Sequence, residues 1–183
     1  GMGKEIRRSV AMVFGWTNFL PDEIKPIVLS DTELDNRVGR YRMGPDEVLY
    51  LRKEKNYLVE NINEGNDIYC FPIARDTLVF SDYNIKGWFG FDANGQANSL
   101  QNEYQNKPMP KMAANEFSPG EYLRAKKYTE AKAGYREMKM NEYQITYLAY
   151  DLMNRKPLDS EAVKTILELA VEQHPNSSIV YSR

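Results

Sequence analysis

Short stretches in which every second position is apolar fill the middle of the chain, between residues 34 and 104. The stretch 57–62, Tyr-Leu-Val-Glu-Asn-Ile, shows this alternation clearly. A period of two places the apolar side chains on one face of a strand, which is typical of an antiparallel sheet that is half buried. We expect seven stretches to form strands: 38–43, 48–51, 57–62, 68–73, 77–80, 87–91 and 97–104.

Turn residues separate these stretches. Asp92-Ala-Asn94-Gly95 lies between two apolar runs, and Asn-Gly favours a type I′ hairpin turn because both central residues of that turn need positive φ. Hairpin connections throughout would give a meander of about six to eight strands. Such a sheet has two edge strands that must be paired or hidden, so we expect it to close into a barrel or half-barrel.

A helical pattern precedes the sheet, over residues 4–16. Gly15 and the following Pro21 predict where this helix ends. An amphipathic helix must pack against something, either the sheet of the same module or another domain. Four apolar residues fall on its apolar face: Ile6, Val10, Val13 and Phe14.

The segment 19–29 contains two prolines and predicts an extended linker. Ser30 and Glu33 then have the spacing of a capping box, which predicts a short helical turn over 31–36 that leads into the first strand. The acidic residues of this turn lack the glycine and the distal glutamate of an EF-hand loop, so we interpret them as a solvated helix cap.

After a second proline-containing linker, over 105–119, the composition shifts to Ala, Glu, Lys, Tyr and Leu. The last two helices resemble one tetratricopeptide-type hairpin, with Ala162, Ile166 and Leu169 near its small and large positions. One such unit cannot bury its own apolar face, so it must pack on the preceding helix, the sheet or a partner. The apolar spacing predicts three helices: 120–140, 142–154 and 161–173.

These patterns predict an α+β protein in three parts. Residues 1–30 form an N-terminal helix and linker, residues 31–107 form the antiparallel β-barrel or half-barrel, and residues 118–183 form an α-helical tail. At 183 residues and 42% hydrophobic composition the chain is long enough and apolar enough for packed domains.

Charge and hydropathy exclude some classes of function. The net charge is −2, without the basic footprint of a nucleic-acid-binding protein, and no apolar run is long enough to cross a bilayer. The one cysteine, Cys70, lies in an apolar strand and is interpreted as a buried, inert thiol.

No catalytic or metal-binding motif is evident. The single histidine, His174, precedes Pro175 at the end of a predicted helix, where a role as a helix cap is the simplest interpretation. No Ser-x-x-Lys motif, no zinc-ligand spacing and no glycine-rich phosphate loop is present. We therefore expect neither a catalytic residue nor a bound metal or cofactor.

Aromatic residues are frequent in the predicted sheet, at 12% of the whole chain. They could fill the barrel as its core. Alternatively they could line a cavity for an apolar or planar ligand, since eight-stranded barrels can hold one, and tyrosine and tryptophan bring polar tips that orient a ligand. Six aromatic residues are the candidates for that site: Tyr41, Tyr57, Tyr69, Phe80, Trp88 and Phe91.

Three blocks resemble the serine β-lactamase-like hydrolases. Residues 4–16, Lys-Glu-Ile-Arg-Arg-Ser-Val-Ala-Met-Val-Phe-Gly-Trp, are similar to the helix that closes the catalytic domain of that family, E-I-x-R-S-x-A-x-x-Y-x-W. Residues 29–41 are similar to the start of the lipocalin-like domain that follows it in many members, with the phrase L-x-x-Y-x-G-x-Y. Residues 89–100 resemble the hairpin F-x-x-D-x-x-G-x-x-x-x-L of the same domain.

The resemblance implies a C-terminal accessory region of such a hydrolase, with a lipocalin-like barrel and a tetratricopeptide-like tail. The nucleophilic serine and the lysine of the family have no counterpart here, so the chain is expected not to be an enzyme. It would pack against a serine hydrolase domain or mediate self-association, and the first helix would be a remnant of the catalytic domain. The resemblance also implies a bacterial protein that is exported or periplasmic.

Two functions therefore stand as hypotheses. The first is a non-catalytic interaction module, and the alternative is a lipocalin-like barrel that binds a small apolar ligand. The residues expected to make contacts in the first case are Val10, Phe14, Trp16, Tyr147 and Ile166.

Overall fold

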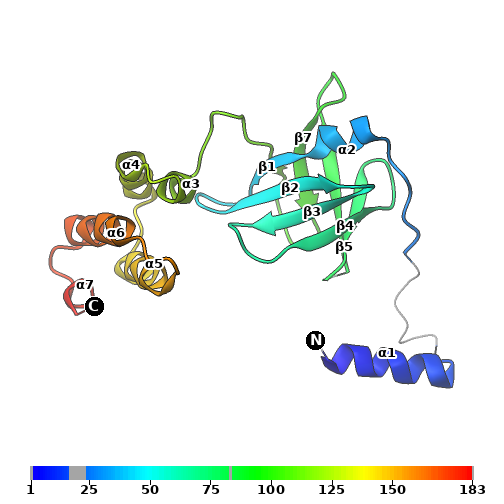
Figure 1. Ribbon diagram of the computed structural model, residues 1–183, viewed down its shortest axis with the longest axis horizontal. Helices are drawn as coiled ribbons and strands as arrows, with labels where there is room; N and C mark the ends of the chain where they lie inside the picture. The colour runs from blue at the N-terminus through cyan, green and yellow to red at the C-terminus, as the bar shows by residue number, and fades with distance from the viewer. Residues whose placement is uncertain (1, 17–23, 83, 183) are drawn as a thin grey trace.

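The computed structural model describes residues 2–16, 24–82 and 84–182 of the chain (Figure 1). A helix and a linker precede an antiparallel barrel, and a group of short helices follows it. The helices are α1 (Met2–Phe14), α2 (Asp31–Arg37), α3 (Pro119–Arg124), α4 (Tyr128–Met138), α5 (Glu142–Asn154), α6 (Ser160–Gln173) and α7 (Ser178–Tyr181). The strands are β1 (Gly39–Arg42), β2 (Val48–Glu54), β3 (Tyr57–Ile62), β4 (Ile68–Pro72), β5 (Thr77–Phe80), β6 (Ile85–Phe91), β7 (Ala97–Asn102) and β8 (Met109–Pro110).

The sheet is an eight-stranded meander in which each strand pairs antiparallel with the next. Its first and last strands meet at an isolated bridge between Tyr41 and Lys111, and Met112 N donates a 2.7 Å hydrogen bond to Arg40 O. The sheet is therefore a nearly closed barrel, and the predicted α+β class is confirmed. β8 lies within the segment that was expected to be a linker, because two residues with a proline between Lys107 and Lys111 carry no strand pattern of their own.

Side chains fill the interior of the barrel. Leu34 of α2 belongs to this core and is 1% exposed, so α2 covers one end of the barrel. In Figure 1 α2 lies at the upper end of the barrel, away from the helical tail. The buried core contains Leu29, Leu34, Tyr41, Leu49, Leu51, Leu58, Ile68, Cys70, Leu78, Phe80, Ile85, Phe89, Ala97, Leu100 and Met109.

Two local predictions hold in outline. The Ser30–Glu33 capping box is present, with Ser30 N donating to Glu33 Oε2 at 2.9 Å. The hairpin at Asp92–Gly95 also forms, but of its two central residues only Gly95 has positive φ, at +74°. The predicted type I′ turn is therefore wrong. Asp92 Oδ1 instead accepts hydrogen bonds from the backbone amides of Asn94 and Gln96. These bonds stabilise a hairpin loop that is longer than a two-residue turn.

The single helix predicted over 120–140 is two helices, α3 and α4. Between them Lys126 adopts a left-handed conformation with φ of 59°. Lys126 N donates to Leu123 O and Lys127 N donates to Tyr122 O, which is the pattern of a Schellman motif. A glycine normally marks such a helix end. Here a lysine takes that place, so no residue of the local sequence indicates the break.

The helices after the barrel bury a second core of their own, which includes Ile145, Ile166 and Leu169. Figure 1 shows this helical tail beside the tip of the β1–β2 hairpin. Helix α1 stands apart from both bodies in the same view. Among the described residues, none of α1 belongs to the barrel core, whereas Leu34 of α2 does.

Candidate functional site

The six aromatic residues proposed for a ligand cavity are not brought together. Tyr41 and Phe80 lie inside the barrel core, where both are almost fully buried. Tyr41 Oη donates a 2.7 Å hydrogen bond to Arg37 O, so its polar tip is already engaged. Burial is the main cause that raises the pKa of Tyr41 above its ordinary value, and the phenol stays neutral.

The other four aromatic residues lie at the surface. Tyr57 and Tyr69 are neighbours on the outer face of β3 and β4, with ring centroids 5.6 Å apart. Trp88 and Phe91, on β6, are each more than a third exposed. The set is thus divided between the core and the outside of the barrel.

The five residues proposed for contacts are also divided. Val10, Phe14 and Trp16 are grouped at the N-terminal helix, where the rings of Phe14 and Trp16 stack with centroids 5.5 Å apart. Tyr147 on α5 is 69% exposed. Ile166 on α6 is fully buried in the core of the helical tail, so it supports packing and is not available to a partner.

Glu60 is a buried carboxylate within the barrel. On β3 it lies opposite Leu51 on one side and Ile68 on the other, and both of these are core residues. Only 4% of Glu60 is exposed. Burial, and secondarily the charge of Asp82, raises the pKa of Glu60 to about 7. This carboxyl group is therefore partly protonated at neutral pH.

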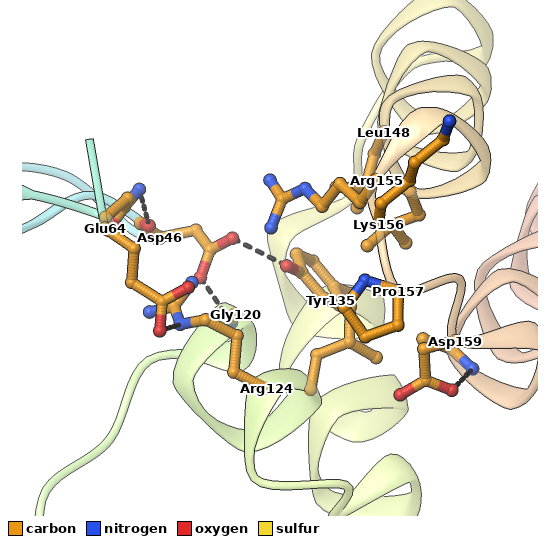
Figure 2. A pocket seen from close by; sticks show the side chains of 14 residues that line it. Asp46, Glu64, Gly120, Arg124, Tyr135, Leu148, Arg155, Lys156, Pro157 and Asp159 are labelled. Carbon is orange, nitrogen blue, oxygen red and sulfur yellow. Dashed lines mark hydrogen bonds and ion pairs between the residues drawn. The ribbon is translucent and has the colours of Figure 1, made fainter. Parts of the chain in front are cut away.

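The hollow with the most converging polar groups lies between the barrel and the helical tail (Figure 2). We call it the inter-body cleft. Its volume is about 440 Å³, within the range of small-molecule sites. Barrel loops supply Asp46, Asn63 and Glu64, and the helical tail supplies the remaining lining residues.

Asp46 lies in the inter-body cleft and bonds the barrel to the helical tail there. Its Oδ1 accepts a 2.5 Å hydrogen bond from Gly120 N, and its Oδ2 accepts a 2.6 Å hydrogen bond from Tyr135 Oη. Asn63 Nδ2 donates to the backbone carbonyl of Asp46 at 3.0 Å and holds the loop in place. Burial, followed by the charge and hydrogen bond of Asp46, raises the pKa of Tyr135, so this phenol remains a neutral donor.

A second polar cluster joins the two bodies beside the cleft. Glu121 of α3 accepts from Arg40 Nη1 at 2.8 Å and from Tyr50 Oη at 2.8 Å. Arg124 Nη2 donates to Tyr50 Oη at 3.2 Å, and Arg124 Nε pairs with Glu64 at 3.4 Å. These bonds cross from β1, β2 and the β3–β4 loop to α3, so the cleft has a fixed wall on that side.

The opposite wall comes from the turn between α5 and α6. Arg155 Nε and Nη2 donate to Asp151 Oδ2 at 2.9 and 2.6 Å, and Figure 2 shows the guanidinium directed toward Asp46 and Tyr135. Lys156 follows it and is exposed. Below them, Leu148 and other apolar side chains line the hollow.

The polar side chains of the cleft can donate and accept hydrogen bonds and form ion pairs. Its lining residues include neither histidine nor cysteine. Among the described residues, no group of three or more His, Cys, Asp or Glu side chains is placed to hold a metal ion. Within the same residues, no helix is both long enough and apolar enough to cross a membrane.

No model of a known protein family matches this chain, and no curated protein matches it.

Sequence reasoning did not find the cleft. Asp46 and Tyr135 are separated by 89 positions, and each has an ordinary local explanation, as a turn residue and as an apolar helix position. Gly44-Pro45-Asp46 has the composition of an ordinary turn, and nothing local to it indicates that the Asp46 carboxylate holds a helix.

Proposed function

We propose that the chain is a non-catalytic accessory module that packs against a serine hydrolase domain of the β-lactamase-like type. In this proposal the barrel is lipocalin-like and the helical tail is tetratricopeptide-like, as the resemblance of residues 4–16, 29–41 and 89–100 to that family implies. The observation that carries the proposal is the exposed apolar face of α1.

The apolar face of α1 is large for its length. Ile6, Val13 and Phe14 are 57%, 79% and 66% exposed. Burying one such side chain contributes roughly 1.5–3 kcal/mol, so a partner that covers all three gains several kcal/mol. Because none of its described residues belongs to the barrel core, α1 is available to serve as the contact helix.

The alternative function, a small apolar ligand inside the barrel, has less support. Fifteen buried residues occupy the interior, and the proposed aromatic residues are divided between core and surface. No specific observation favours that alternative.

The test is complementation with a serine β-lactamase-like hydrolase domain that ends before its own final helix. We expect the chain to bind this domain through α1. Val13→Asp should weaken binding by about tenfold or more, because it would bury a charge at the contact. Met12→Asp is the matched control, since Met12 is similarly exposed but points about 100° around the helix from Val13, outside the apolar face.

Two results would contradict the proposal. One is no binding of the hydrolase domain by the unmodified chain. The other is an equal loss of binding in the Val13→Asp and Met12→Asp variants. Sedimentation of the chain alone tests whether α1 mediates self-association instead. In that case the unmodified chain would be a dimer, Val13→Asp would dissociate it, and the hydrolase domain would not bind.

A further inference from the structure

Helix α5 carries a row of exposed tyrosines along one side. Tyr143, Tyr147 and Tyr150 are 66%, 69% and 50% exposed. Their spacing of four and then three residues places them on the same side of the helix, because successive helical residues are about 100° apart. We call this row the tyrosine stripe. Met153, three residues after Tyr150, is also exposed and lies next to the end of the stripe.

The tyrosine stripe is turned away from the core and from the inter-body cleft. Ile145, Ala149 and Leu152, on the other side of α5, are buried in the core of the helical tail. Leu148 and Leu152 line the cleft. In Figure 1 α5 lies on the lower side of the helical tail, with α4 on the upper side. Neither the core nor the cleft therefore uses the three rings of the stripe.

The stripe is large enough to form the centre of an interface. A tyrosine side chain can bury about 150–250 Å², so at these exposures the three side chains offer roughly 300–450 Å². Exposed patches of this size mark interaction sites on soluble proteins, and tyrosine is enriched among the residues that dominate binding energies. The area is about half of the roughly 800 Å² that each partner buries in a standard interface, so with a polar rim it fits a weak dimer.

The two ends of α5 carry charges of opposite sign. Glu142 lies in the first turn of the helix, and Lys156 follows its last turn. Among the described residues neither side chain has an ion-pair partner, whereas Arg155 is already paired with Asp151. Figure 2 shows Lys156 directed away from the cleft. Both charges are therefore available to a partner whose charges are arranged in the opposite order.

A second copy of α5 that runs antiparallel offers that arrangement. A two-fold axis close to Tyr147 would place the two copies of this ring against each other. Tyr143 of each copy would then lie beside Tyr150 of the other, because they come four residues before and three residues after Tyr147. The same axis would bring Glu142 of each copy toward Lys156 of the other. A parallel pairing would instead place like charges together at both ends.

We propose that two copies of this chain form a symmetric dimer through antiparallel packing of their tyrosine stripes. The rings would form the centre of the interface, and the Glu142–Lys156 pairs would close its two ends. Complementary charges of this kind fix the orientation of the partners more than they add affinity. The interface lies on α5, so it does not depend on α1 or on the proposed function.

Sedimentation equilibrium of the full chain, at protein concentrations up to the millimolar range, measures this dimer. Tyr147→Glu should raise the dissociation constant at least about tenfold, because it would place two carboxylates against each other at the two-fold axis. The position is exposed and glutamate favours helix, so the fold should be retained, which circular dichroism checks. Tyr104→Glu is the matched control: Tyr104 is an exposed tyrosine between β7 and β8, outside the stripe, and its substitution should leave the dimer unchanged.

An exchange of charges tests the antiparallel orientation. Glu142→Lys and Lys156→Glu should each raise the dissociation constant by about threefold to tenfold, because each variant places like charges together at both ends of the interface. The variant that carries both substitutions restores the opposite pairing. Its dissociation constant should therefore return to that of the unmodified chain, which independent effects of the two substitutions would not produce.

Three results would overturn the proposal: a chain that stays monomeric at the highest concentration, a dimer that Tyr147→Glu leaves intact, or a double charge exchange that does not restore dimerisation. A dimer that is lost in Val13→Asp and kept in Tyr147→Glu would place the contact on α1 instead. Binding of the hydrolase domain is a separate measurement that Tyr147→Glu should leave unchanged. Failure of the dimer and failure of the proposed function are therefore distinguishable.

Discussion

Tyr135 donates a 2.6 Å hydrogen bond to the carboxylate of Asp46, and this bond joins helix α4 to the β1–β2 hairpin. The two residues belong to two bodies with separate cores. Asp46 also receives the amide of Gly120, so one carboxylate holds both α3 and α4 against the barrel. Asp46 is thus one attachment point between barrel and tail, and the Glu121 cluster is another.

Removing the Tyr135 hydroxyl should loosen this attachment. Tyr135→Phe keeps the buried ring but leaves Asp46 Oδ2 without its donor, and we expect a loss of about 1–3 kcal/mol in the free energy of unfolding. Urea denaturation followed by circular dichroism measures the change. Tyr143→Phe is the control, because Tyr143 is an exposed tyrosine of the tail whose hydroxyl should contribute little. Equal stability of Tyr135→Phe and the unmodified chain would contradict the assigned role.

Gly120 is required by its closeness to Asp46. A Cβ at this position would lie 2.8 Å from Asp46 Oδ1, closer than a real contact allows. Gly120→Ala should therefore destabilise the chain by about 1–3 kcal/mol. The cost should be smaller when it is measured in the Asp46→Ala background, since the clashing group is gone, and a double-mutant cycle gives that difference. If the stability losses of Gly120→Ala and Asp46→Ala were simply additive, the clash with Asp46 would not be the cause of the loss.

Glu60 predicts a pH-dependent stability. Its pKa in the folded chain is about 7, above the ordinary value of 4.5, so the folded state holds this proton more tightly than the unfolded state does. The contribution of Glu60 to stability is therefore complete below about pH 4.5 and falls as the pH rises toward 7, by roughly 3 kcal/mol in total.

The measurement for Glu60 is urea unfolding across this pH range. Glu60→Gln removes the titrating group and keeps the size of the side chain, so it should lose this part of the pH dependence and exceed the unmodified chain in stability at about pH 8. All other carboxylates are shared by the two proteins and serve as the internal control. Parallel pH profiles for the two proteins would refute the prediction.

Cys70 should be protected from alkylation in the folded chain. Burial in the barrel core, followed by the nearby charge of Glu60, raises the pKa of its thiol. Because only the thiolate reacts, iodoacetamide should label native protein about a hundredfold or more slowly than protein in denaturant. Mass spectrometry over time follows the label. Rapid labelling of native protein would mean that the barrel opens near β4 far more often than its packing suggests.

The barrel could be predicted from the sequence because its signals are local. Alternation over 57–62, the turn residues at 92–95 and the Ser30–Glu33 capping box each act within a few positions, and each has a counterpart in the structure. The break after α3 could not be predicted, since a lysine takes the left-handed position at residue 126. The inter-body cleft could not be predicted either, because its key bond joins residues far apart in the chain.

The pairing of Tyr41 with Lys111 also determines how the barrel would respond to tension. Helix α2 connects the N-terminal part of the chain directly to β1, and the segment that leads to the helical tail leaves just after β8. A pull between α1 and the tail would therefore act first on the seam between these two strands, which has a single bridge, whereas even β7 and β8 share two residue pairs. The strands would separate there sequentially, one residue pair at a time, so the barrel would unfold under a small force.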